Sequence, residues 1–404
     1  MSDENIHEES ANEINANPEV NTEEPIIDNV SVKIEYMESD TENTENTENT
    51  ENTENSGDVA TDIKKRNRKR NIFRIIQICS IIAFIVFTAL FVNEVFIQPY
   101  HSDKVIQEVQ NLYQGSKLND NPTDLQKNNS EAPVVSQTIN EPPDNTPYLD
   151  PDRDSQGRLL VFRDLLNINQ DVKGWLTVPG TLINYPVLQS EKDDPEYYLT
   201  RNFNKEADKR GSIFIDADSS LEENARNIVL YGHNMTGSGT MFHQLVEYQE
   251  QDIYKERPVI NFDTIYQTGR WKIFAVIITN GSSKYEKLFD YTRSAFSGSS
   301  DFLNFVYQLR VRSLYNVNVD VNENDQLLTL STCSYELENY RTVVIARKVR
   351  DGEDPAVDVE GAAKNKNPLY LQAWYDTYGG TPPKVTTFEE ALAAGEITWY
   401  TPVR

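Results

Sequence analysis

LLTLSTC (residues 327–333) and RTVVIA (residues 341–346) are two short apolar runs joined by the more polar stretch Ser334–Tyr340. Runs of this length, bounded by polar residues, are typical of β-strands. Two adjacent strands joined by such a loop place Cys333 and Arg341 at neighbouring strand ends. The rest of the fold can be worked out from this pair.

Similar apolar runs recur upstream and predict further strands. They cover residues 175–178, 183–187, 212–215, 227–231, 259–262, 271–278 and 317–321. Apolar residues and segment lengths predict helices over residues 159–169, 241–247 and 301–314. Many short strands at this spacing favour a closed barrel or a sandwich. We therefore expect a mostly β domain with helical insertions over residues 151–350.

An uncharged apolar stretch, IIQICSIIAFIVFTALFV, occupies residues 75–92, and two apolar residues before Arg74 extend it to the length that crosses a bilayer. A cleaved signal peptide is the alternative, but its apolar region would be shorter, nearer the N-terminus and followed by a cleavage site. The basic run Lys64–Arg70 precedes the stretch, and the positive-inside rule places it in the cytoplasm. We therefore expect a basic juxtamembrane segment (64–71) and one transmembrane signal anchor (72–92), with the N-terminus inside and the rest of the chain outside.

The charge of the chain is very uneven. Its 404 residues carry a net charge of −26, and residues 1–63 contribute 19 acids against a single lysine. This segment is poor in aromatic residues and includes five consecutive Thr-Glu-Asn triplets over residues 41–55. Such a composition cannot bury enough apolar surface to fold, so we expect a disordered acidic cytoplasmic tail, either solvated or docking a cytoplasmic partner. The single short basic cluster excludes a general nucleic-acid binder.

Two segments flank the β domain outside the membrane. Residues 93–150 contain a short helical pattern over 101–114 and then an Asn- and Pro-rich stretch, so we expect an extracellular stalk. Residues 351–404 hold several aromatic residues and a helix-like run over 388–394. Because this aromatic content is wrong for a disordered tail, we expect the C-terminal extension to pack on the barrel.

Cys333 is the one cysteine expected outside the membrane, since Cys79 lies within the span. It is either a buried small hydrophobe or a reactive thiol, and its place at a strand end favours the reactive interpretation. A free thiol has a pKa of about 8.5 and needs a nearby base or cation to ionise near pH 7. His233 follows the predicted strand 227–231 and is the better base candidate. His243 lies among apolar residues on a predicted helix and is expected to be structural.

Acyl transfer also needs hydrogen-bond donors for the oxyanion of the tetrahedral intermediate. Arg341, at the strand end next to Cys333, is a candidate donor, although an arginine considered alone is more often a surface residue. The histidines are few and no carboxylate cluster has ligand spacing, so neither a metal nor another cofactor is expected. Two cysteines also exclude a disulfide scaffold or a Cys-rich zinc domain.

Several motifs in order along the chain resemble the sortase family, and within it class B. They are INYPV (183–187), YYL (197–199), GSIFID (211–216), YGHNM (231–235), MF (241–242), TLSTCSYE (329–336) and RTVV (341–344). The resemblance covers roughly residues 155–350. It implies a closed eight-stranded barrel and a catalytic constellation of His233, Cys333 and Arg341.

The resemblance also implies weaker candidates for substrate contact. These are Asn184, Ser331, Thr332 and Ser334. The backbone N–H of Ser334 is expected to help Arg341 bind the oxyanion.

The implied function is that of a membrane-anchored cysteine transpeptidase on the outer face of a Gram-positive-type cell. Cys333 would attack a carbonyl in a sorting motif near the C-terminus of a secreted protein. His233 would protonate the leaving amine and later deprotonate the incoming amine, which would come from peptidoglycan or from a pilin. Two alternatives stay open: a cysteine peptidase, in which water replaces the amine, and a surface binding module without enzymatic activity.

Overall fold

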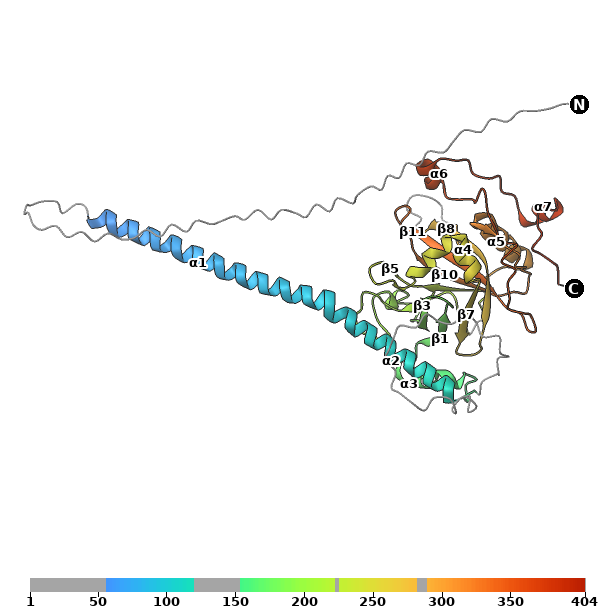
Figure 1. Cartoon of the computed structure of the whole chain (residues 1–404), viewed down its shortest axis with the longest axis horizontal. Helices are drawn as coiled ribbons and strands as arrows, with labels where there is room; N and C mark the ends of the chain where they lie inside the picture. Colours follow the sequence, from blue (N-terminus) through green and yellow to red (C-terminus); the bar gives the residue numbers. More distant parts are fainter. Residues whose placement is uncertain (1–55, 120–152, 222–224, 282–288, 404) are drawn as a thin grey trace, which may run out of the picture. The chain divides into compact units, whose positions relative to one another are not determined.

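The structure, a computed structural model, describes residues 56–119, 153–221, 225–281 and 289–403 (Figure 1). The expected disordered tail lies outside these ranges up to residue 55, and so does the expected stalk from residue 120 onward. The chain divides into two compact units, residues 1–78 and 79–404.

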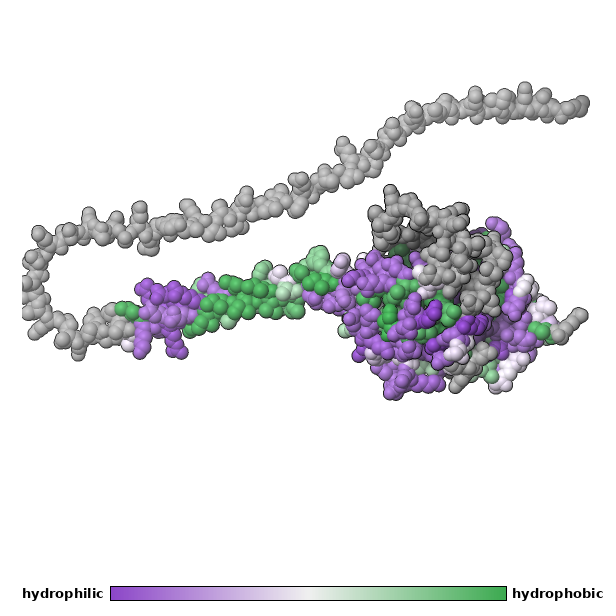
Figure 2. Space-filling model, turned by 90° about the horizontal axis from the view of Figure 1, so that it is seen from below, coloured by the Kyte–Doolittle hydropathy of each residue, from purple (hydrophilic) through white to green (hydrophobic). Residues whose placement is uncertain are grey.

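The apolar stretch lies in one long helix, α1 (Ser56–Val92). Residues 56–63 are therefore helical, although their composition assigns them to the disordered tail. Extending an existing helix costs far less than nucleating one, so the helix of the apolar run continues into this polar segment. Among the described residues, one helical stretch, Thr61–Lys117, is long and apolar enough to cross a membrane, and none of its apolar window is buried. Figure 2 shows this window as a hydrophobic band that follows a hydrophilic segment of the helix.

The β domain is a closed barrel of eight strands in the order β1-β2-β3-β4-β10-β11-β8-β7. Its strands are β1 (Val172–Thr177), β2 (Asn184–Leu188), β3 (Ile213–Ile215), β4 (Asn227–Tyr231), β7 (Val259–Thr264), β8 (Arg270–Asn280), β10 (Leu327–Cys333) and β11 (Tyr340–Lys348). Most neighbouring strands are antiparallel, but the pairs β2–β3 and β4–β10 are parallel. The expected eight-stranded barrel with helical insertions is therefore confirmed.

Short elements connect the barrel strands. Two small strand pairs are β5 (Asn234–Met235) with β6 (Thr240–Met241), and β9 (Tyr315–Asn316) with β12 (Ala363–Lys364). The helices after α1 are η1 (Asn93–Ile97), α2 (Gln98–Asn119), η2 (Leu160–Phe162), α3 (Arg163–Ile168), η3 (Tyr197–Leu199), η4 (His243–Gln249), α4 (Gln251–Glu256), α5 (Ser299–Arg312), α6 (Gln372–Tyr378) and α7 (Phe388–Ala393).

Three predicted elements differ from those observed. The strand expected over residues 317–321 does not form, because its backbone groups bond elsewhere: the Arg310 guanidinium donates to two of its carbonyls, and the N–H of Val321 donates to the carbonyl of Trp399. The helix expected over 159–169 is a 3₁₀ turn followed by the short helix α3. The helix expected at Met241 begins two residues later, since Met241 pairs in β6 with a φ of 57°.

Helix α2 packs on the barrel. The Tyr113 ring stacks on the Trp175 ring of β1, with centroids 4.1 Å apart, and the Tyr113 hydroxyl donates to Asp263 of β7 at 3.0 Å. Because an aromatic stack and a buried hydrogen bond hold this helix in place, residues 98–119 are not the free spacer that composition suggests.

The C-terminal segment after β11 packs against the core of the barrel. Strand β12 pairs with β9, and Phe388 of α7 is buried against Trp399 and Tyr400, with ring centroids 5.9 and 5.2 Å away. Helix α6 places Trp374 against Tyr340, the first residue of β11, with centroids 6.3 Å apart. This segment is therefore in direct contact with the β10–β11 hairpin.

Candidate active site

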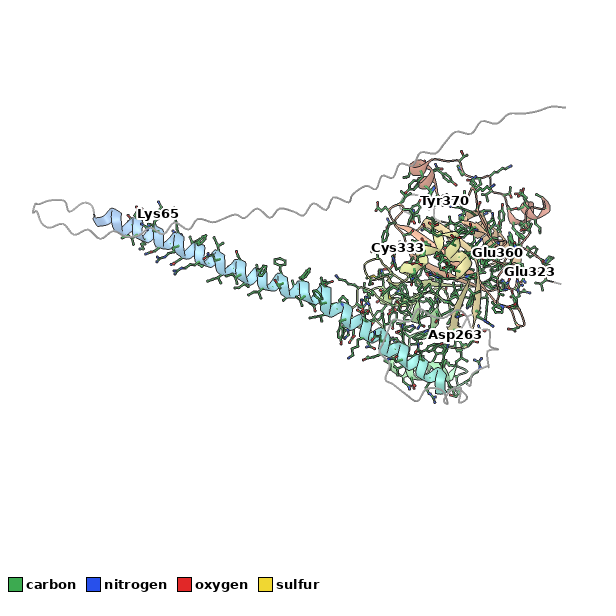
Figure 3. The ribbon with its side chains drawn as sticks, viewed as in Figure 1. Lys65, Asp263, Glu323, Cys333, Glu360 and Tyr370 are labelled. Carbon is green, nitrogen blue, oxygen red and sulfur yellow. The ribbon has the colours of Figure 1, made fainter. Side chains whose placement is uncertain are left out.

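Cys333 and Arg341 are direct cross-strand partners in the antiparallel pair β10–β11. Directly opposite residues of such a pair have Cα atoms about 5 Å apart and side chains on the same face. Both side chains are half-buried, whereas Thr332 and Ser334 on either side of the cysteine are buried. The strand pairing thus presents a thiol and a guanidinium on the same face where β10 terminates. Figure 3 labels Cys333 in the β domain.

The position of the Arg341 guanidinium depends on a neighbouring glycine. A Cβ at Gly281 would lie 2.9 Å from Nε and 3.0 Å from Cζ of Arg341, so the guanidinium would have to leave its observed position if residue 281 had a side chain. The guanidinium also donates through Nη1 to the carbonyl of Tyr340 at 3.3 Å. None of the carboxylates that the structure describes forms an ion pair with Arg341. Its charge is therefore not neutralised by a described acid and can act on a substrate oxyanion.

His233 reaches the same end of the barrel from β4, which runs parallel to β10. The register pairs Tyr231 with Ser331, so His233 and Cys333 are each two residues beyond matched positions. The chains stay side by side past the strand ends, because Thr332 Oγ1 donates to the carbonyl of Gly232 at 2.8 Å. The Asn234 side chain, one residue after His233, also bonds to the carbonyl of Cys333 at 2.9 Å, so the two chain segments are still adjacent at His233 and Cys333.

The imidazole of His233 is oriented by a backbone carbonyl. Its Nε2 lies 2.8 Å from the carbonyl oxygen of Leu199, in η3. A carbonyl can only accept, so Nε2 carries a hydrogen and donates it. The second nitrogen, Nδ1, is therefore the one available for proton transfer.

Asn234 links His243 to the backbone of Cys333 by two hydrogen bonds. The Asn234 amide donates through Nδ2 to the carbonyl of Cys333 at 2.9 Å and accepts through Oδ1 from Nδ1 of His243 at 2.7 Å. His243 thus acts on the backbone of the nucleophile strand through Asn234. This agrees with its expected structural role.

The weaker substrate candidates are placed less favourably. Ser331 is buried and its hydroxyl lies 3.0 Å from that of Tyr291, while the buried Thr332 hydroxyl is bonded to the barrel backbone. Asn184 is on β2, two strands away from β4, and its side-chain oxygen accepts from Trp175 and Thr177. The structure therefore does not bring Asn184 together with Cys333.

The expectation for the Ser334 amide is wrong. Its N–H donates to the carbonyl of Tyr340 at 2.9 Å across the hairpin, so it is not free to bind an oxyanion. The Ser334 hydroxyl is buried and has no hydrogen-bond partner among the described residues. The antiparallel pairing of the hairpin, which continues one residue past β10, takes up the amide.

The sequence analysis missed Tyr291, which lies in the connection between β8 and α5. Its hydroxyl bonds to Ser331, two residues before Cys333 and on the same face of β10. Burial raises the pKa of the Tyr291 phenol, although the hydrogen bond to Ser331 and the charge of Arg341 act in the opposite direction. No residue pattern around Tyr291 marks it, because the contact depends on how a long connection folds back over the sheet.

Comparisons with known proteins agree with this geometry. The family model described as "Sortase domain" matches residues 176–349. Sortase B of Staphylococcus aureus is 34% identical over 191 residues, which cover 47% of this chain and 75% of that protein. Sortase B of Listeria monocytogenes is 36% identical over 175 residues, covering 43% of this chain and 68% of that protein.

Solved structures of similar proteins include one described as a Staphylococcus aureus sortase B–substrate complex. It is 26% identical, with 63% of this chain and 99% of that chain covered and a TM-score of 0.48. The assignment of this chain to a family rests on the two sortase B proteins, because each is more than 30% identical and matched over more than two thirds of its length. The chain therefore belongs to the sortase family, as a cysteine transpeptidase of class B.

Proposed function

We propose that this chain is a membrane-anchored transpeptidase that cleaves a sorting motif near the C-terminus of secreted proteins. It joins the new carboxyl end to an amine of the cell wall or of a pilin. The proposal is supported by Cys333 and Arg341, which are cross-strand partners on β10 and β11, and by His233, which lies two residues after the end of the neighbouring strand β4.

In the first step the Cys333 thiolate attacks the scissile carbonyl of the sorting motif. A bond forms between Sγ and the carbonyl carbon, and the carbonyl oxygen becomes an oxyanion. His233 then gives the proton on Nδ1 to the leaving amine as the C–N bond breaks. Its Nε2–H stays bonded to Leu199, so the ring keeps its orientation during the transfer.

In the second step an incoming amine attacks the thioester. Nδ1 of His233 takes a proton from this amine, a new C–N bond forms, and Cys333 leaves as thiolate. Since Nδ1 both gives and receives the proton, the enzyme ends the cycle in its starting protonation state.

Arg341 supplies the positive charge that stabilises both oxyanions. The fork of the guanidinium has several donors in a fixed geometry, which suits an oxygen on the neighbouring strand end. The Ser334 N–H takes no part in this proposal, because it is bonded to Tyr340.

The location at the membrane rests on the apolar helix and its basic flank. We propose a single span over residues 72–92, with the acidic tail in the cytoplasm and the catalytic domain outside the cell. An enzyme that acts on exported proteins has to meet them on that side of the membrane. The basic run Lys64–Arg70 supports this orientation.

Trapping the acyl-enzyme in living cells tests the proposal. Peptides linked to Cys333 by a thioester are identified by mass spectrometry, and cells that carry Cys333→Ala serve as the control. The expected adducts end at a common motif near the C-termini of secreted proteins and are released as amide products when an amine is added. Release by water at the same rate with and without the amine would identify a peptidase instead.

A further inference from the structure

The loop between β10 and β11, Ser334–Asn339, joins the proposed nucleophile strand to the strand of Arg341. The strand register pairs Cys333 with Arg341, and the conformation of this loop affects Tyr340, the residue before Arg341. The loop is exposed in part, with 69% of the Tyr335 surface accessible. Such a loop needs contacts from other elements to hold one conformation.

Helix α6 contacts the middle of this loop and the residue that follows it. The Tyr378 hydroxyl donates to the carbonyl of Glu336 at 2.7 Å, and the Trp374 ring lies against the ring of Tyr340. Tyr340 is a central residue, because its carbonyl accepts from the Ser334 N–H and from Nη1 of Arg341. A shift of Tyr340 would therefore move the guanidinium.

Helix α6 is itself fixed to the barrel. Before it, Leu369 donates its N–H to the carbonyl of Val311 in α5, and β12 pairs with β9. The Trp374 ring also stacks on Tyr370, with centroids 4.2 Å apart and planes 12° from parallel. The helix is therefore a supported element that can transmit rigidity to the loop.

Helix η4 also contacts the loop. The Gln249 side chain donates to Glu336 at 2.5 Å and to Thr342 at 2.8 Å. Glu336 is thus held through its carbonyl by α6 and through its side chain by η4. Helix η4 lies within residues 176–349, which match the sortase domain, whereas α6 lies after residue 349.

We propose that α6 is a positioning element for the active site, in which Trp374 and Tyr378 hold the β10–β11 loop so that Arg341 stays aligned on the oxyanion. This inference rests on the proposed roles of Cys333 and Arg341. Neither α6 residue is assigned a contact with substrate; both act through Tyr340 and Glu336. The C-terminal segment is thus a functional part of this enzyme.

The experiment compares two reactions of Cys333, measured on the full chain in detergent with Cys79→Ser as background. Acylation by p-nitrophenyl acetate forms an Sγ–carbon bond, passes through an oxyanion and releases p-nitrophenolate. Alkylation by iodoacetamide displaces iodide and forms no oxyanion. A loss of Arg341 alignment therefore slows the first reaction and leaves the second unchanged.

Expected changes follow from the contacts that each variant removes. Tyr378→Phe lowers the acylation rate about three- to tenfold, the value of one hydrogen bond, and Trp374→Ala lowers it about tenfold or more. Trp374→Phe keeps an aromatic ring against Tyr340 and restores most of the rate. The alkylation rate of each variant stays within about twofold of the parent rate, because the oxyanion donor is not used.

Tyr375→Phe is the matched control. This tyrosine lies on the same helix, and its hydroxyl donates to the carbonyl of Pro368 and accepts from the N–H of Tyr370, neither of which belongs to the loop. Equal acylation rates for Tyr378→Phe and Tyr375→Phe would overturn the inference, as would a parallel loss of acylation and alkylation. Failure of the proposed function has a different signature, namely a parent enzyme that is acylated no faster than Cys333→Ala.

Discussion

Cys333 and Arg341 lie directly opposite each other in the β10–β11 pair. The carbonyl of Tyr340 accepts hydrogen bonds from the N–H of Ser334 and from the Arg341 guanidinium. The alignment of thiol and guanidinium is therefore part of the strand register. The backbone pairing of the two strands already places the two side chains on the same face. Variants that disturb this register or the space around the guanidinium should separate thiol reactivity from oxyanion stabilisation.

The first prediction concerns Arg341→Lys. An ammonium group has one point charge and cannot reproduce the guanidinium fork, so kcat/KM for transpeptidation should fall about a hundredfold or more. Alkylation of Cys333 by iodoacetamide should keep its rate. Arg163→Lys, at an exposed position of α3, is the control and should leave both rates unchanged. Near-normal turnover of Arg341→Lys would show that the arginine does not bind the oxyanion.

Gly281→Ala tests whether the position of the Arg341 guanidinium matters. The added Cβ would lie 2.9 Å from Nε of Arg341, so the guanidinium has to move away. Because small displacements of a catalytic group are costly, kcat should drop about tenfold or more while the melting temperature changes little. Gly237→Ala, where a Cβ meets no atom within 4 Å, provides the comparison. If the two variants have the same kcat, Arg341 tolerates displacement.

The two histidines should behave differently. His233→Ala should abolish transpeptidation, because in the proposed mechanism Nδ1 of His233 protonates the leaving amine and deprotonates the incoming one. His243→Ala removes the donor to Asn234 and should cost about 1 kcal/mol of unfolding free energy, with most of the activity kept. Thermal melts and a product assay on both variants separate these outcomes. A His243→Ala enzyme that has no transpeptidation activity but keeps the parent melting temperature would assign His243 a direct catalytic role.

The sequence predicted much of the barrel and the central site because both depend on local patterns. The strand pair around Cys333 and Arg341 follows from two apolar runs and one loop, and the parallel partner strand ends just before His233. What could not be predicted depends on backbone groups and on long connections. The Leu199 carbonyl that orients His233 has no side-chain signature, and Tyr291 reaches Ser331 from a segment far away in sequence.

The error about Ser334 has the same origin. A residue after a nucleophile is a reasonable oxyanion donor on sequence grounds, but whether its N–H is free depends on how far strand pairing extends. Here the pairing continues to Tyr340 and takes up that N–H. The packing of α2 on the barrel is likewise a tertiary result, since the composition of that segment fits a spacer. The aromatic content of residues 351–404 predicted that this segment packs on the barrel, but not that α6 contacts the β10–β11 loop.

Stability at low pH should depend on Glu353. This carboxylate receives hydrogen bonds from the fully buried Arg347 and from Lys272, each at 2.7 Å. Burial alone would raise its pKa, but the hydrogen bonds from Arg347 and Lys272 outweigh that effect and lower the pKa to about 2 from 4.5. Because the folded pKa lies below the unfolded one, the ionised group stabilises the fold above about pH 4.5, and this contribution is lost as pH falls toward 2.

Urea unfolding at pH 7 and pH 3 checks this dependence. Glu353→Gln should lower the unfolding free energy at pH 7 and reduce the difference between the two pH values. Glu360→Gln, at an exposed position, should change neither. An unfolding free energy of Glu353→Gln that equals the parent value at pH 7 would contradict the role of this ion cluster.

The last prediction concerns topology, on which the proposed function depends because an enzyme acting on exported proteins has to face the outside. The basic run before the apolar helix predicts a cytoplasmic N-terminus, and Cys79 lies within the apolar stretch of α1. In intact cells a membrane-impermeant thiol reagent should therefore label Cys333 and leave Cys79 unlabelled. External protease should cut between residues 120 and 150, which are rich in Asn and Pro, and spare the Thr-Glu-Asn repeats over residues 41–55. Cleavage of the repeats from outside, with Cys333 protected, would reverse the orientation and exclude a role in sorting exported proteins.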